Sequence, residues 1–168
     1  QITASDCAGA INICTNANFA VDPNGFGAIE EIDEFNFPIS NPQLNPNIGP
    51  QGVPNWGCLL TGEVNSTWMI INVETSGQLE FSMGGPATNG FYFDWVMWPY
   101  NPNTCFEIQA NLLPPVQCNW NMSDAGITGA ATNTNIAGMG FDLVNFEVPL
   151  DVLCGEQYII CFSNYSSA

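Results

Sequence analysis

The stretch TWMIINVETSGQLEFSM, residues 67–83, decides the fold class of this chain. Residues 67–73 are mostly apolar and rich in β-branched side chains, which favour extended strands. Residues 78–83 alternate strictly between polar and apolar side chains, as expected for a strand with one face on a core. The ETSG between the two segments is a turn signal. The stretch therefore predicts two consecutive β-strands joined by a turn.

The strand pattern continues toward the C-terminus. Residues 91–100, FYFDWVMWPY, are apolar on both faces except at Asp94, which is typical of a central strand covered on each side. Short strands separated by Gly, Pro and Asn turns, without intervening helical periods, favour two packed antiparallel sheets. Further strands are predicted at residues 106–112, 116–121, 141–148 and 157–163.

The N-terminal third has a different composition. Residues 21–56 are rich in Pro, Asn and Gly and are expected to cross the surface as a long irregular connection. A short helix is expected within residues 1–20. We predict a single all-β domain over residues 1–168, a jelly-roll-like antiparallel β-sandwich with a long irregular N-terminal loop region. Residues 1–56 would form the N-terminal extension and loop, and residues 57–168 the main strands.

The chain contains 16 acidic residues and no Lys, Arg or His, so its formal net charge is −16. No side-chain salt bridge can form, and each carboxylate must be solvated, hydrogen-bonded, protonated or paired with a bound cation. Nucleic acid and anionic membrane surfaces need Lys or Arg for binding, so both are excluded as partners. No apolar run is long enough to span a bilayer, so no membrane insertion is expected.

The same composition removes most catalytic chemistry. Ser–His triads, Schiff-base lysines, Arg-clamped phosphoryl transfer and zinc–histidine hydrolysis all lack an essential residue type. A glycosidase needs only two carboxylates, but no acidic pair stands out among the 16. We therefore expect a protein that is not an enzyme, with a carboxylate-dependent glycosidase as the least favoured alternative.

The cysteines indicate disulfide bonds in an oxidising compartment. They contain no CxxC pair, and the chain has no histidine to complete a mixed metal site. We favour a pair between Cys105 and Cys118, which would close a Pro-containing segment between strands. The odd number leaves one thiol over. The seven cysteines are Cys7, Cys14, Cys58, Cys105, Cys118, Cys154 and Cys161.

Two motifs carry a family resemblance that covers most of the chain. They are GCL-x-x-GE-x-x-S-x-W at Gly57 to Trp68, and L-x-GE-x-Y at Leu153 to Tyr158. With DCAGAINIC and YFDWVMWPY, they resemble a domain of large secreted Bacteroidota surface proteins. These are proteins of the gliding-motility and type IX secretion cargo kind, and the domain is similar to pre-peptidase C-terminal and CUB-like sandwiches. The resemblance implies a secreted, cell-surface accessory or adhesive module within a longer polypeptide.

The resemblance also implies candidate ligands for a cation. Glu63 and Asp94 are the pair carried over from the family pattern, with Asp124 or Asn145 to complete the site. The family usually has an acidic pair before its central aromatic strand, whereas here aromatic residues precede the lone Asp94. Calcium is the metal that suits the chain, because it prefers carboxylate and carbonyl oxygens and no histidine nitrogen competes.

Two further groups of residues are candidates for a surface role. The acidic run EEIDE, residues 30–34, is interpreted as a solvated loop face, with cation binding as the alternative. Trp98 and Tyr100, near the end of the predicted central strand, are the best candidates for aromatic faces that stack on sugar rings.

Two functions from different classes follow from these observations. The first is an extracellular binding or adhesive module for glycans or other surface ligands, dependent on calcium. The second is a structural subunit or stalk domain that packs against neighbouring domains or copies of itself through its sheet edges. The acidic composition, the long loop and the resemblance favour the first.

Overall fold

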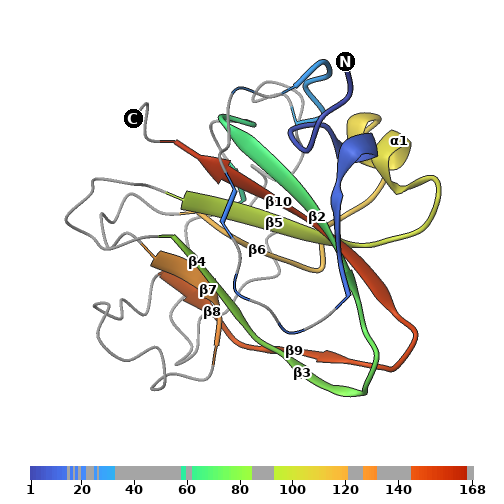
Figure 1. The fold of residues 1–168 in the computed structure, drawn as a ribbon, viewed down its shortest axis with the longest axis vertical. Helices are drawn as coiled ribbons and strands as arrows, with labels where there is room; N and C mark the ends of the chain where they lie inside the picture. Colours follow the sequence, from blue (N-terminus) through green and yellow to red (C-terminus); the bar gives the residue numbers. More distant parts are fainter. Residues whose placement is uncertain are drawn as a thin grey trace.

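The computed structural model of the chain is drawn in Figure 1. Its described strands lie in three sheets, with one short α-helix and one short 3-10 helix outside them. The structure describes residues 1–14, 16, 18, 20–21, 25, 27–32, 58–59, 62–84, 93–120, 127–131 and 145–165. Most of the predicted long loop therefore lies outside the described residues.

The largest sheet has five strands in the order β1-β2-β10-β5-β6. β10 lies at its centre and pairs antiparallel with β2 and β5, over seven residue pairs on each side. Runs of aliphatic and aromatic residues make these three strands suited to the middle of a covered sheet. The five strands are β1 (Ile11–Ile13), β2 (Ser66–Asn72), β10 (Gln157–Asn164), β5 (Phe93–Pro99) and β6 (Gln117–Asn119).

Two smaller sheets pack against one face of the large sheet (Figure 1). Their apolar side chains meet those of β2, β5 and β10 in what we term the inner core, which contains Met69, Trp95 and Ile160. One small sheet consists of β3 (Gly77–Leu79) and β9 (Leu150–Val152), and the other of β4 (Phe81–Gly84), β7 (Ile127–Ala130) and β8 (Phe146–Glu147).

Side-chain alternation along the central strand separates this inner core from a second, outer core. On β10, Ile160 and Phe162 point to the inner core, whereas Ile159 and Cys161 point to the opposite face. The large sheet is therefore buried on both sides. The outer core contains Ile32, Trp68, Ile70, Val96, Trp98, Ile108, Ile159 and Cys161, with the cysteines of both disulfides beside them.

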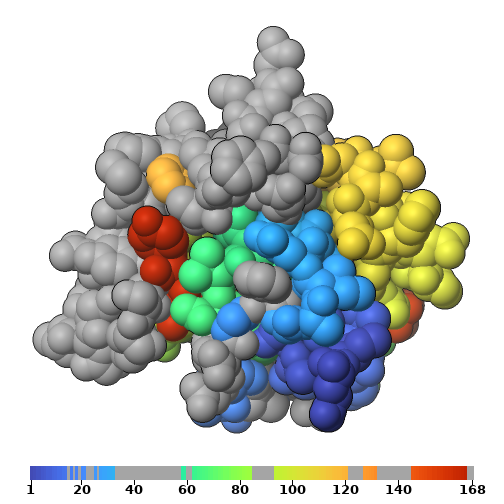
Figure 2. All heavy atoms as spheres, turned by 90° about the horizontal axis from the view of Figure 1, so that it is seen from above, coloured from blue at the N-terminus to red at the C-terminus, as the bar shows by residue number. Residues whose placement is uncertain are grey.

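Segments without strand structure cover the outer core. They are the 3-10 helix η1 (Cys7–Gly9), residues 28–32 and the helix α1 (Thr104–Gln109). Figure 2 shows this covering layer, with the light-blue residues near 30 between the green residues near 60 and the yellow α1 region. Residues 28–32 and η1 therefore form a lid of irregular chain over one face of the sheet.

The prediction of an all-β fold is confirmed, and most described strand pairs are antiparallel as expected for a β-sandwich. Two pairs, β1 with β2 and β7 with β8, are parallel. The predicted strands at 67–73, 91–100 and 157–163 correspond to β2, β5 and β10. The short β1, β7 and β9 were not predicted, because three or four residues carry too little periodicity.

The predicted strand at residues 106–112 is wrong, because residues Thr104–Gln109 form α1. The alternation in FEIQ imitates a strand, yet Ile108 is buried in the outer core while Phe106 is 67% exposed. The Thr104 hydroxyl accepts a hydrogen bond from Asn101 N at 2.8 Å and donates one to Pro99 O, which turns the chain into the helix. Within the described part of the chain, no helix has the length and apolar character needed to cross a bilayer.

Candidate functional site: buried carboxylates beneath the N-terminal segment

Two disulfide bonds tie the covering layer to the sheet. Cys7 of η1 is bonded to Cys105 of α1, with Cα atoms 5.7 Å apart, and Cys58 is bonded to Cys118 of β6. The predicted Cys105–Cys118 pair is therefore wrong, because the outer core brings a more N-terminal cysteine against each of them. The two bonds interleave along the chain and indicate an oxidising environment. Cys14 and Cys154 are exposed free thiols, and Cys161 is a buried one.

Asp6 is a buried carboxylate that connects two parts of the covering layer. Its oxygens accept hydrogen bonds from the backbone N–H groups of Thr3 (2.7 Å), Ala28 (2.6 Å) and Ile29 (3.0 Å). Burial opposes ionisation, but these donors outweigh it and hold the pKa of Asp6 below its ordinary value. Asp6 therefore remains ionised without any cationic partner.

Gly27 gives the Asp6 carboxylate the space it occupies. Gly27 has a φ of +79°, and a Cβ placed on it would lie 2.5 Å from the Asp6 carboxyl group. We expect Gly27→Ala to lower the free energy of unfolding by about 2–3 kcal/mol, because a strained backbone is added to disrupted hydrogen bonds. Urea denaturation measures this, with Gly77→Ala as the control, since a Cβ there meets no atom within 4 Å. An equal loss in both variants would contradict the prediction.

Glu63 lies just before β2 and is 2% exposed. Its Oε1 accepts the indole N–H of Trp68 at 2.7 Å, and its Oε2 accepts the backbone N–H groups of Glu31 (3.1 Å) and Ile32 (3.4 Å). Glu63 N also donates to Ile32 O at 3.1 Å. The residue thus fastens residues 31–32 to the start of β2.

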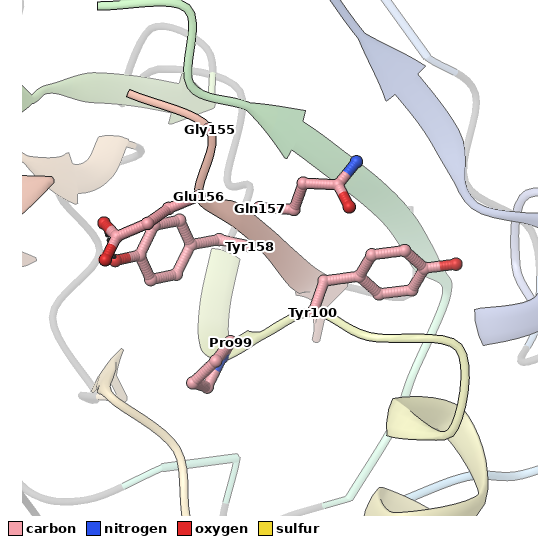
Figure 3. Close-up of a pocket in the computed structure, with 6 residues that line it drawn as sticks. All are labelled: Pro99, Tyr100, Gly155, Glu156, Gln157 and Tyr158. Atoms are coloured by element: carbon pink, nitrogen blue, oxygen red, sulfur yellow. Dashed lines mark hydrogen bonds between the residues drawn. The ribbon is translucent and has the colours of Figure 1, made fainter. Parts of the chain in front are cut away.

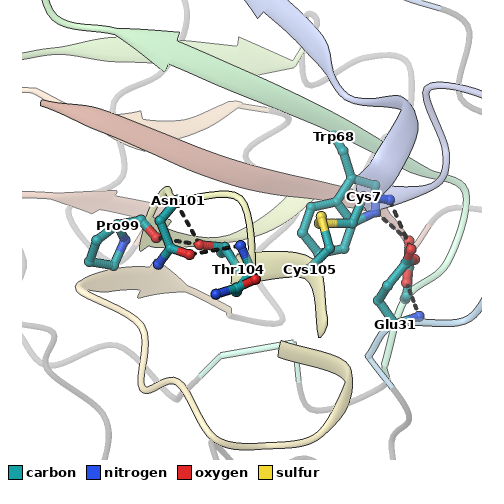
Figure 4. The surroundings of a disulfide bond; sticks show 9 residues. Cys7, Glu31, Trp68, Pro99, Asn101, Thr104 and Cys105 are labelled. Atoms are coloured by element: carbon teal, nitrogen blue, oxygen red, sulfur yellow. Dashed lines mark hydrogen bonds between the residues drawn. A yellow bond between two sulfur atoms is a disulfide. The ribbon is translucent and has the colours of Figure 1, made fainter. Parts of the chain in front are cut away.

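Glu31 lies beside it and is 5% exposed. Its Oε1 accepts the backbone N–H of Cys7 at 2.9 Å, next to the Cys7–Cys105 bond and Trp68, as Figure 4 shows. Its other oxygen, Oε2, is also buried, and no donor among the described residues reaches it. One side of this carboxyl group is therefore bonded, and the other faces the protein interior without a partner.

The two glutamates are buried without a positive charge to balance them. The pKa of Glu31 is raised to about 8, mainly by burial and secondly by the negative charge of Glu63. Burial raises the pKa of Glu63 to about 7, against the opposing effect of its hydrogen-bond donors. At least one of the two carboxyl groups therefore holds a proton at mildly acidic pH.

The three predicted calcium ligands that the structure describes, Glu63, Asp94 and Asn145, do not come together. N–H groups point at both oxygens of Glu63, which is the environment of a hydrogen-bonded carboxyl group and not of a metal ligand. Asp94 is on the same face of the large sheet, but the register Ser66–Ser163–Asp94 places it two strand spacings, about 9.6 Å, from Ser66.

Asn145 lies on the opposite side of that sheet. Its carbonyl accepts the Thr128 hydroxyl at 2.7 Å, and the same hydroxyl accepts the N–H of Trp95 in the inner core. Asp124 lies outside the described residues. Within the described ranges, no three acidic or Cys side chains gather as a metal site. The residues described here do not fit the expected calcium site.

The acidic run at residues 30–34 does not form a uniform solvated face. Glu30 is exposed as expected, but Glu31 is turned inward and buried, and this part of the interpretation is wrong. The reason is Cys7, whose N–H needs an acceptor beneath the covering layer. Asp33 and Glu34 lie outside the described residues.

The aromatic candidates differ from each other. Trp98 is 0% exposed, stacks on Trp68 with ring centroids 5.8 Å apart and donates its N–H to Leu113 O, so its assignment as a ligand-facing residue is wrong. Tyr100 is half-buried at the rim of a shallow hollow of about 260 Å³. Figure 3 shows Tyr100 and Tyr158 pointing away from each other there, so they do not form a stacking platform.

No family model, curated protein or solved structure matches the chain. The site is therefore assigned from its own chemistry. The arrangement of Asp6, Glu31 and Glu63 can bind and release protons and can fasten residues 28–32 to the sheet. Glycoside hydrolysis needs two carboxyl groups flanking a substrate, and the buried position of Glu31 and Glu63 does not provide this.

Proposed function

We propose that this domain is a non-catalytic, extracellular binding or adhesive module that acts through its acidic outer surface. The observation that carries the proposal is that the carboxylates of the domain divide into a buried group and a surface group. Five of the described carboxylates are turned inward as internal hydrogen-bond acceptors or buried acids, and the surface ones have no cationic side chain anywhere in the chain to neutralise them. The surface ones are Glu30, Glu74, Glu80, Glu107, Asp151 and Glu156.

Several of these surface carboxylates lie near one end of the large sheet. The turn before β10 packs against the residues after β2, because Cys154 Sγ donates to Glu74 O at 3.1 Å. Glu156 in that turn accepts hydrogen bonds from Leu153 N and the Tyr158 hydroxyl. Both bonds lower the pKa of Glu156, and the bond from Leu153 N has the larger effect. Its negative charge therefore persists to lower pH than that of an ordinary glutamate.

A uniformly acidic surface adheres to a second acidic surface only when cations lie between them. Divalent cations from the surrounding medium fit this role, and carboxylate oxygens favour calcium. The two disulfides support an oxidising, extracellular setting. We infer that the natural ligand is an acidic glycan, bridged to the domain by calcium ions.

Adhesion of beads that carry the domain tests this function. We expect beads to be retained on an anionic polysaccharide in millimolar calcium and to be released by EDTA, with little retention on neutral dextran. Retention that is equal in sodium chloride of the same ionic strength, or equal on the neutral polymer, would contradict the proposal.

Calcium should also raise the thermal stability of the folded domain. If the affinity lies in the range of extracellular modules, a tenfold excess over Kd adds roughly 1.4 kcal/mol, or about 3–5 °C in melting temperature. Removing three surface carboxylates by Glu74→Gln, Asp151→Asn and Glu156→Gln should reduce this shift. The control is Glu30→Gln, Glu80→Gln and Glu107→Gln, since each set changes the net charge from −16 to −13 (−16 + 3). No calcium-specific shift in the unmodified domain would leave the carboxylates as solvating groups only.

A further inference from the structure

The carboxyl groups of Glu63 and Glu31 fasten residues 31–32 and Cys7 beneath the covering layer, whereas Asp6 holds Ala28 and Ile29. Glu63 accepts N–H groups from Glu31 and Ile32, and Glu31 accepts the N–H of Cys7. Ile32 is 0% exposed and packs in the outer core with Trp68 and Cys161. Glu31 and Glu63 therefore hold residues 31–32 over the sheet.

This closed arrangement leaves one carboxyl oxygen without a donor. Glu31 Oε2 is buried, and within the described part of the chain nothing donates to it. A buried, unsolvated carboxylate oxygen is costly, and a second negative charge beside it makes it more so. A proton on the pair removes both costs, because a protonated carboxyl group carries no charge.

Among the described residues, no cationic side chain lies beside the pair that could take over the role of the proton. The titratable groups in the described part of the chain that face the pair are Asp6, ahead of η1, and the Cys161 thiol of β10. On the side of α1 the neighbour is the Cys7–Cys105 disulfide, which does not titrate. Glu30 points outward, and the chain has no Lys, Arg or His.

We propose that Glu31 and Glu63 form a proton-dependent clasp, which holds residues 31–32 over the outer core and releases them when both carboxyl groups ionise. The clasp is closed in acidic and near-neutral solution and opens in mildly alkaline solution. The disulfide keeps η1 attached in both states, so opening uncovers part of the sheet face without separating the N-terminal segment from the domain.

The buried Cys161 thiol reports on this opening. It is 0% exposed beneath the covering layer, and Cys14 and Cys154 are the other free thiols. In a Cys14→Ser/Cys154→Ser background, the rate of iodoacetamide labelling of Cys161 is measured in folded and in urea-unfolded protein at each pH. The ratio of the two rates corrects for the reactivity of the thiol itself. We expect this protection to fall by about a hundredfold or more between pH 6 and pH 9, because both carboxyl groups ionise in this range.

Matched variants assign the effect to the pair. In Glu31→Gln only Glu63 can still ionise, so protection should fall by no more than about tenfold over the same range. Glu30→Gln removes the same charge from the adjacent exposed position and should keep the pH dependence of the background. Protection that does not change with pH, or that responds equally to both substitutions, would overturn the proposal.

A measurement on the unmodified protein keeps the test independent of how the variants fold. The Trp68 indole N–H, which donates to Glu63, should shift in NMR spectra with a midpoint between about pH 6 and pH 9, close to the pKa values of the pair. An invariant Trp68 signal would overturn the clasp. Calcium that restores Cys161 protection at alkaline pH would also overturn it, because a metal ion would then be the natural occupant.

Discussion

Replacing Cys7 and Cys105 together by serine is expected to lower the free energy of unfolding by about 4–5 kcal/mol. The bond spans 98 residues of sequence, and closing a loop of that length removes about 4.7 kcal/mol of chain entropy from the unfolded state. The bond also fastens η1, and with it the Cys7 N–H that Glu31 accepts. For a domain of this size the loss corresponds to a fall of about 10–15 °C in melting temperature.

Urea denaturation under non-reducing conditions measures this effect. Cys14→Ser/Cys154→Ser is the control, because both thiols are exposed and free, and substitutions at such positions usually change stability by less than about 0.5 kcal/mol. A loss below about 1 kcal/mol in the Cys7/Cys105 variant would mean that the covering layer contributes little to the cooperative unit.

The second large effect is a loss of stability as the pH rises. Glu31 and Glu63 have pKa values of about 8 and about 7 in the folded protein, above the ordinary value of 4.5. The folded state therefore binds more protons than the unfolded chain between these values. The stability this provides is fully present below about pH 4.5 and is lost as the pH rises through about 7–8.

We expect this loss to be on the order of 3–5 kcal/mol between about pH 5 and pH 9. The loss cannot exceed the stability that the closed residues 31–32 contribute, because Glu31 and Glu63 become solvated once these residues are released. Urea denaturation over this range measures it, and Glu31→Gln should flatten the profile. A stability that rises with pH over this range would show that the pair is ionised in the folded protein, since Asp6, with its lowered pKa, acts only at more acidic pH.

The three long strands at the centre of the large sheet could be predicted from the sequence, whereas the short strands β1, β7 and β9 could not. β2, β5 and β10 are long and apolar, so period and composition identify them. The parallel pairing of β1 with β2 joins segments far apart in the sequence, which local periodicity does not reveal. At α1 the sequence predicts a strand that does not form. Its residues alternate as in a strand, but the turn at Thr104 and the burial of Ile108 favour a helix.

The candidate site was predictable only in part. Glu63 was singled out, but as a metal ligand, because sequence alone does not show that Trp68 and the chain at 31–32 supply N–H groups to both of its oxygens. Glu31 was placed in a solvated acidic run, since nothing in its neighbours indicates burial. One signal was available, namely that a chain without basic residues must protonate or hydrogen-bond any carboxylate it buries.

The interleaving of the two disulfides along the chain affects how the domain withstands proteolysis. Because Cys7, Cys58, Cys105 and Cys118 alternate between the two bonds, each peptide bond between Cys7 and Cys118 lies inside at least one covalent ring. A single cut anywhere in this region leaves both pieces joined. A nicked molecule therefore keeps its covering layer, and two cuts are needed before any part of it can be shed.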